Sequence, residues 1–251
     1  MLHRVLLFAA ALGFGAAHAH APLAEVTITD RSTGELLPVH AARGERWIAG
    51  TPGNRYAITL HNRSMGRVLA VLSVDGINAI SGETAAWDQA GYVLAPGERA
   101  EIRGWRKSTE RVAAFEFTAL GESYAARTGR PEHVGVIGVA LFREAAPVVS
   151  QVAPAAAARA EAPAAAAEAS GRADSAAKAT NRLGTGHGRS ETSPVQFTRF
   201  ERAQPNPDQV IAIRYDSRAN LVAMGILSPP AARRPEPFPG ALGFVPDPPR
   251  Y

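Results

Sequence analysis

Short stretches of alternating apolar and polar residues recur along the first half of the chain, and turn-forming residues separate them. In one stretch, Tyr56, Ile58 and Leu60 would share one face of a strand. The apolar residues at positions 113, 115 and 117 repeat the same two-residue period. Strands that recur about every 8–12 residues with turns between them are typical of sandwiches and barrels. The sequence therefore predicts an all-β, sandwich-like domain over residues 20–144.

Three further features fit that domain. Residues 68–72 and 134–142 are apolar on both faces, as expected for buried central strands. Pro96 and Gly97 suit the second and third positions of a type II turn, because proline fixes φ and glycine tolerates a positive φ. Residues 122–127 are predicted to form one helical turn.

The composition changes after residue 144. Alanine dominates residues 145–182, with scattered prolines and charges, and no large apolar residue follows Val152 until the end of this stretch. Such a segment buries too little surface to offset the entropy that ordering costs. We interpret residues 145–182 as a flexible linker; the alternative is an exposed helix without a partner.

A second β segment is predicted over residues 183–227. Val195 and Phe197 alternate with polar residues, Ile211 and Ile213 do the same, and the apolar residues 221–227 complete a three-stranded meander. An isolated sheet of this size is only marginally stable. We therefore expect it to pack on the first domain, on a partner or on a second copy. Residues 228–251 are rich in proline and are predicted to be a disordered tail.

The first 19 residues have the pattern of a secretory signal peptide. Arg4 supplies a positive charge, residues 5–17 are apolar, and Ala17-His18-Ala19 matches a cleavage site. The apolar stretch is shorter than the roughly 20 residues that a membrane-spanning helix needs. We expect a periplasmic or secreted protein with no membrane span after cleavage.

Composition excludes several kinds of chemistry. The chain has no cysteine, which rules out thiol catalysis, cysteine-ligated zinc and iron–sulfur clusters. Its net charge of +4 is too small to indicate a nucleic-acid partner. The histidines His61, His133 and His187 show no metal-binding spacing, and no G-x-S-x-G motif occurs. The sequence thus predicts no metal and no cofactor.

The best candidate for a binding surface is the long connection formed by residues 81–92. It combines the carboxylates of Glu83 and Asp88 with the aromatic ring of Trp87. Loops on a rigid β scaffold commonly carry binding sites, and this combination suits sugar rings or peptides. In the alternative interpretation the loop plugs one end of the sandwich, with Trp87 in the core and Asp88 capping a turn.

A second candidate is the basic cluster Trp105, Arg106 and Lys107. Arginine beside tryptophan can bind phosphates, uronic acids or lipopolysaccharide-type surfaces. The alternative is a solvated hairpin with Trp105 turned inward. The glycine-rich residues 184–188 could bind an anion through backbone N–H groups, but a flexible hinge is the simpler interpretation.

Several short sequence motifs follow one another along the chain. They are Ser-Val-Asp-Gly at 73–76, Gly-Tyr-Val-Leu at 91–94, Gly-Trp-Arg-Lys-Ser at 104–108, Ser-Tyr-Ala-Ala-Arg-Thr-Gly at 123–129 and Val-Gly-Val-Ile-Gly-Val at 134–139. Together with residues 184–188 they resemble a group of uncharacterised exported proteobacterial proteins. The resemblance implies export and a β domain. The group has no known activity, so it implies no catalytic residue.

The sequence thus predicts an exported, non-enzymatic protein that binds or scaffolds a cell-envelope component: a glycan, an anionic polymer or a partner protein. One alternative is a periplasmic hydrolase with a site assembled from Glu83, Asp88 and His133. The other is a subunit of an envelope assembly, joined to its neighbour through the C-terminal strands.

Overall fold

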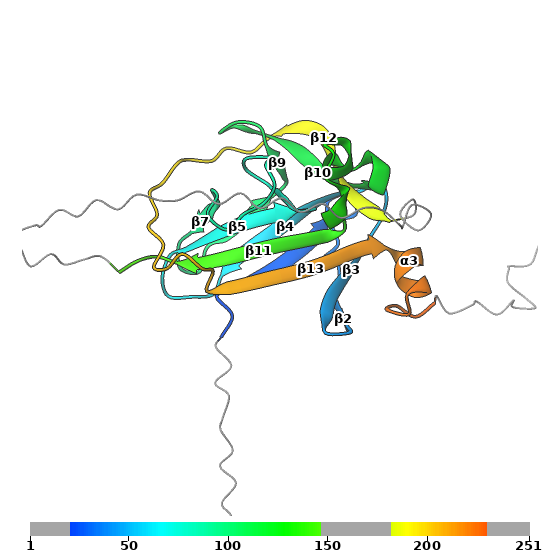
Figure 1. Cartoon of the computed structure of the whole chain (residues 1–251), viewed down its shortest axis with the longest axis horizontal. Coiled ribbons are helices and arrows are strands. Elements are labelled where there is room, and N and C mark those ends of the chain that lie inside the picture. The colour runs from blue at the N-terminus through cyan, green and yellow to red at the C-terminus, as the bar shows by residue number, and fades with distance from the viewer. Residues whose placement is uncertain (1–20, 147–181, 230–251) are drawn as a thin grey trace, which may run out of the picture.

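The computed structural model describes residues 21–146 and 182–229, which form two β-sheets packed face to face (Figure 1). The predicted signal peptide, nearly all of the predicted linker and nearly all of the predicted tail lie outside the described residues. The all-β, sandwich-like fold is confirmed. No helix in the described part of the chain is both long enough and apolar enough to cross a membrane.

The first sheet has the strand order β1-β4-β10-β12, and every pairing in it is antiparallel. Its long strands are β1 (Ala24–Asp30), β4 (Arg55–Asn62), β10 (Arg111–Ala119) and β12 (Leu183–Thr192). Two short strands extend it: β8 (Arg99–Ile102) pairs with β4, and β9 (Gly104–Arg106) pairs with β10.

The second sheet has the strand order β2-β3-β13-β11-β5. These strands are β2 (His40–Ala42), β3 (Glu45–Gly50), β13 (Gln209–Ser217), β11 (Val136–Arg143) and β5 (Val68–Val74). Two short strands, β6 (Ile77–Asn78) and β7 (Tyr92–Leu94), both pair with β5. The pairing of β3 with β13 is parallel, whereas the others are antiparallel.

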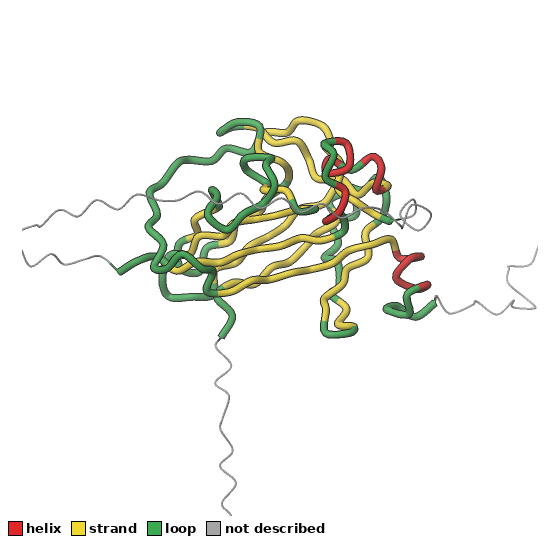
Figure 2. The backbone as a smooth tube through the Cα atoms, viewed as in Figure 1, coloured by secondary structure: helices red, strands yellow, loops and turns green. Residues whose placement is uncertain are grey.

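Short helical segments close the ends of the sheets (Figure 2). They are η1 (Leu120–Glu122), α1 (Tyr124–Arg127), η2 (Pro131–His133) and α3 (Arg218–Ala223). The helical turn predicted within residues 122–127 is therefore present. Ser123 begins α1, because its hydroxyl accepts a hydrogen bond from the N–H of Ala126.

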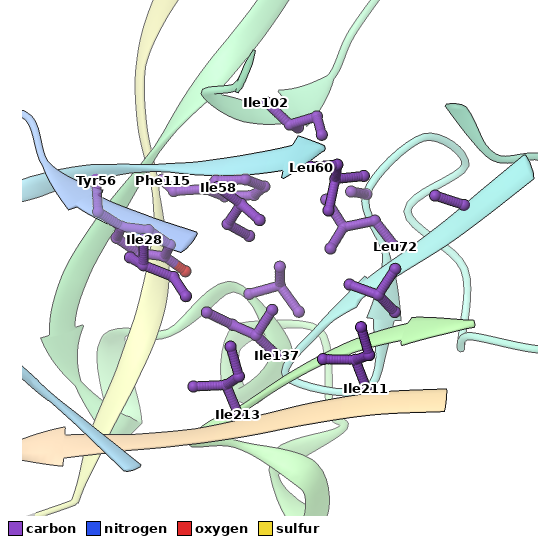
Figure 3. Packing of buried hydrophobic residues seen from close by; sticks show 14 of the residues in the cluster. Ile28, Tyr56, Ile58, Leu60, Leu72, Ile102, Phe115, Ile137, Ile211 and Ile213 are labelled. Carbon is purple, nitrogen blue, oxygen red and sulfur yellow. The ribbon is translucent and has the colours of Figure 1, made fainter. Parts of the chain in front are cut away.

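The core lies between the two sheets (Figure 3). Ile58, Leu60 and Phe115 come from the first sheet, and Leu72, Ile137 and Ile213 come from the second. The two-residue periods predicted at 56–60 and 113–117 match the buried face of β4 and of β10. Burial of one face explains why these strands could be recognised in the sequence.

The predicted C-terminal meander does not form. β12 joins the first sheet beside β10, and β13 enters the second sheet between β3 and β11. The two strands belong to different sheets, so residues 183–227 complete the sandwich instead of forming a unit of their own. β13 is paired with β11 along Gln209–Arg214 and with β3 along Arg214–Ser217.

Two other expectations for this region are corrected. Residues 193–200 form no strand, and residues 218–223 form helix α3 where a third strand was expected. The hydroxyl of Ser217 caps this helix by accepting from the N–H of Asn220, and only Leu221 is buried within it. One buried residue per turn is a helical pattern, which a short apolar stretch does not distinguish from a strand.

The glycines of residues 184–188 lie in β12 and form no hinge. A methyl group on Gly184 would lie 2.6 Å from the Cβ of Ser123, and one on Gly188 would lie 2.8 Å from the carbonyl oxygen of Ala114. These glycines allow close packing of β12 against its neighbours.

Candidate functional site

A groove of about 1210 Å³ opens beside the short strands β7 and β8. It is lined by Leu69, Ile80 and residues 88–93, 98–102, 106–109, 193–198 and 200–202. The lining combines parts of both sheets with the connection between β12 and β13, segments far apart in the sequence. Such a concave site on a rigid β scaffold is a candidate for binding.

One wall of the groove is the extended segment 193–202, which we call the strap. It leaves the end of β12 and runs along the molecule toward the start of β13 (Figures 1 and 2). Near its beginning, the backbone N–H groups of Ser193 and Val195 donate to the carbonyl oxygens of Glu110 and Thr109. Phe197, in its middle, is 95% exposed.

Arginine side chains fasten the strap to the rest of the protein. The Arg106 guanidinium donates to the carbonyl oxygen of Ser193 at 2.5 Å. That of Arg67 donates to the carbonyl oxygen of Arg199 at 2.9 Å. At the far end, Arg202 donates to the carbonyl oxygen of Gln89 at 2.7 Å. The strap is therefore held by these polar contacts and by Phe200, which packs against a small apolar cluster, whereas Phe197 is exposed.

Two polar atoms of groove residues are buried without a hydrogen-bond partner: the Nε atoms of Arg106 and Arg202. Burial raises the pKa of Tyr92, and the charge of Arg106 and a hydrogen bond with Arg106 partly oppose that shift. A buried donor without an acceptor costs about 1–3 kcal/mol.

Charges of both signs surround the groove. The carboxylates are Asp88, Glu98, Glu101 and Glu201, and the cations are Arg99, Arg106, Lys107 and Arg202. The four negative and four positive side chains balance. In this part of the described surface there is no strong positive electrostatic potential of the kind that would concentrate a polyanion.

The structure brings together three of the predicted site residues. Asp88 from the loop of residues 81–92, and Arg106 and Lys107 from β9 and the turn after it, all line the groove. Glu83 lies outside it, and its carboxylate accepts a long hydrogen bond of 3.4 Å from Gln89. Trp87 is 54% exposed and also lies outside the groove, so it does not plug the core.

Trp105 is a core residue and not a ligand-binding one. It is 4% exposed, its indole N–H donates to the carbonyl oxygen of Gly186, and its ring meets that of Phe115 edge-on at 5.2 Å. The neighbouring residues in β9 alternate in direction, which buries Trp105 while Arg106 reaches the groove. The inward-facing alternative describes this residue.

The residues of the hydrolase alternative do not share the groove. Asp88 lines it, but neither Glu83 nor His133 does. His133 ends η2 and packs against the turn at Gly76, where its Cβ would be 2.7 Å from a methyl group on that glycine. Within the described residues, no three His, Asp or Glu side chains converge in a way that could hold a metal ion.

The sequence analysis missed a buried polar network that joins the two sheets. Asp75 accepts hydrogen bonds from the Tyr215 hydroxyl at 2.5 Å and from the N–H groups of Gly135 and Thr185 at 2.9 and 2.8 Å. The Thr185 hydroxyl lies 2.7 Å from that of Tyr215 and 2.6 Å from that of Tyr56. Asp75 and Tyr215 belong to the second sheet, whereas Thr185 and Tyr56 belong to the first.

Burial dominates the electrostatics of this network. It raises the pKa of Asp75 from 3.8 to about 6, although the hydrogen bonds from Tyr215, Gly135 and Thr185 act in the opposite direction. Burial likewise raises the pKa of Tyr215 and that of Tyr56 well above 10.0. All four side chains are buried and none lines the groove, so the network ties the sheets together away from the groove.

In the sequence, Asp75-Gly76 could be recognised as the end of a strand. Nothing in its neighbours indicates that the carboxyl group turns inward, because its partners lie at positions 135, 185 and 215.

Comparison of the chain with known protein-family models, with curated proteins and with solved structures finds no match to any of them.

Proposed function

We propose that this protein is an exported, non-enzymatic binding protein that holds a component of the cell envelope in the groove beside β7 and β8. The candidate components are a glycan, an anionic polymer or a partner protein. Export rests on the pattern of the first 19 residues.

The observation that carries the proposal is the groove itself. It gathers charged side chains of both signs from segments far apart in the sequence, beside a small apolar cluster that includes Leu69, Val93 and Phe200. A concave site that combines apolar surface with convergent polar groups favours a role in binding.

The test is binding to a panel of soluble probes by isothermal titration calorimetry. The panel contains chitotetraose, polygalacturonate and a library of synthetic peptides. Asp88→Ala and Lys107→Ala should each weaken binding of the probe that is recognised, because both side chains line the groove. Glu83→Ala is the matched control, since Glu83 is an exposed carboxylate of the same loop but lies outside the groove.

Binding that responds equally to Asp88→Ala and Glu83→Ala would place the site elsewhere and contradict the proposal. Steady hydrolysis of any probe that Asp88→Ala abolishes would replace it with the hydrolase alternative. A failure of every probe to bind would also count against it.

A further inference from the structure

We infer that the occupant of the groove is an extended polypeptide segment, which binds as an added strand along the free edge of β8. This inference rests on the proposed function and narrows the three candidate components to one.

The first step is that β8 has one unpaired edge, which faces the groove. β8 pairs with β4 and with no other strand in the described part of the chain, and all of its residues line the groove. In an antiparallel pair, alternate residues bond to the partner strand and the others point away. The N–H of Asn62 donates to the carbonyl oxygen of Glu98, and the same register continues through Leu60–Ala100 and Ile58–Ile102.

This register leaves the backbone groups of Arg99 and Glu101 pointing away from β4. An extended peptide laid along the edge could therefore pair with two successive outward residues of β8. Strand addition to an open sheet edge is a common mode of peptide recognition, in which backbone hydrogen bonds give affinity and alternate side chains give specificity.

The second step is that the opposite wall also presents unpaired backbone. Within residues 182–229, the three strap residues 196–198 make no backbone hydrogen bond. β7, which also lines the groove, pairs only with β5 among the described strands. A peptide in the extended conformation would therefore meet donors and acceptors from both sides, with its own N–H and C=O groups at the spacing of a strand.

The third observation concerns the apolar and charged side chains that line the groove. Leu69, Val93 and Phe200 belong to one small apolar cluster at the groove, and Phe197 stands exposed on the strap. The groove is also lined by four carboxylates and four cations. A polyanion would meet all four carboxylates. A peptide with apolar side chains on one face and mixed charges on the other complements both parts of the lining.

The test selects peptides of about 10 residues, the usual upper length of a strand, from a phage-displayed random library against the full chain. Selected peptides are then synthesised and measured by fluorescence anisotropy. Each is also made in two N-methylated forms, methylated at odd or at even positions. We expect one form to lose binding and the other to keep it, because only alternate N–H groups of an added strand face β8.

The matched variants are Phe197→Ser and Met65→Ser. The two side chains are 95% and 94% exposed, so neither change should affect folding, but only Phe197 lines the groove. We expect Phe197→Ser to weaken peptide binding about tenfold, as loss of an apolar anchor does, and Met65→Ser to leave it unchanged. Hydrogen exchange at the amides of Arg99 and Glu101 should slow when the peptide binds.

Peptides that lose binding equally in both methylated forms, or that are insensitive to Phe197→Ser, would overturn strand addition at this edge. If no peptide is selected while chitotetraose or polygalacturonate binds in an Asp88-dependent way, the inference fails and the proposed function stands. If neither class of probe binds at the groove, both fail.

Discussion

The residue whose environment has the largest physical consequence is Asp75. Its carboxyl group is buried between two sheets and is satisfied by donors from three separate segments. A buried carboxyl is costly to ionise, and here burial outweighs the hydrogen bonds that favour the charged form. Asp75 therefore contributes differently to stability at different pH values.

We expect the free energy of unfolding to fall as the pH rises from about 4 to about 6. In that window the unfolded chain releases the Asp75 proton, with an ordinary pKa of 3.8, while the folded protein keeps it up to its raised pKa of about 6. The contribution of Asp75 is thus complete below pH 3.8 and is lost through pH 6. A shift of this size corresponds to about 3 kcal/mol. Urea unfolding at a series of pH values measures it.

Asp75→Asn is the variant that isolates this effect. It has no carboxyl group to titrate, so the difference in unfolding free energy between the two proteins should change across the window. Glu191 also makes the free energy of unfolding depend on pH. Burial raises its pKa, but Arg31 and Arg55 together lower it below 4.5, so its contribution to stability is lost as the pH falls. This contribution is the same in both proteins and cancels in their difference. A difference that stays constant from pH 4 to pH 7 would contradict the prediction.

The Tyr215 hydroxyl should matter more than that of Tyr92. Tyr215→Phe removes a donor to Asp75 and a partner of Thr185, and we expect a loss of about 1.5–3 kcal/mol in unfolding free energy. Tyr92→Phe removes a buried hydroxyl whose hydrogen bond is with Arg106, so we expect a smaller loss. If urea unfolding shows that the two variants lose the same unfolding free energy, the hydrogen-bond network around Asp75 makes no special contribution to stability.

At the scale of elements, the strands that bury one face were predictable and the connections were not. The large side chains that β4 and β10 bury in the core repeat every second position, so burial leaves a local pattern in the sequence. Val195 and Phe197 have the same spacing, yet they lie on the strap. Their pattern does not mark the buried face of a strand, since Val195 is 36% exposed and Phe197 is 95% exposed. A two-residue period indicates a strand only where tertiary packing covers one side.

The candidate site was half predictable for a similar reason. Asp88, Arg106 and Lys107 could be singled out because polar and charged residues in a turn-rich region reach solvent. The other wall, including Arg202, belongs to a segment that the sequence places about 100 residues away, and only the entry of β12 and β13 into the two sheets brings it close. Trp105 was misassigned because alternation along a three-residue strand is too short to show in the sequence.

The pairing of β9 with β10 depends on the absence of a side chain at residue 104. A methyl group on Gly104 would lie 2.0 Å from the carbonyl oxygen of Ala113, which is backbone and cannot move aside freely. We expect Gly104→Ala to lower the unfolding free energy by roughly 1–3 kcal/mol. Gly66→Ala is the control, because nothing lies within 4 Å of the added methyl group there. Similar unfolding midpoints for the two variants would refute this account.

At the scale of the whole molecule, the sandwich is assembled from two parts of the chain that each lack an essential piece. Residues 21–146 supply most strands, but without β13 the strands β3 and β11 lose the partner that joins them. Residues 182–229 supply β12 and β13, which pair with other strands and not with each other. Neither part contains a complete core.

We therefore expect the fragment 182–229 to be unfolded alone and to fold when the fragment 20–146 is added. Circular dichroism in the far ultraviolet should show β structure that appears only in the mixture, with a one-to-one end point in a titration. The intact chain should unfold in a single cooperative transition. A fragment 182–229 that showed a stable β spectrum by itself would revive the separate meander.

The central place of β13 also has a consequence for biosynthesis. A ribosome releases the amino end first and adds about 5–20 residues per second, so β11 emerges several seconds before the strand that must lie beside it. During that interval the nascent polypeptide exposes the apolar faces of an unfinished sheet, which are prone to aggregation.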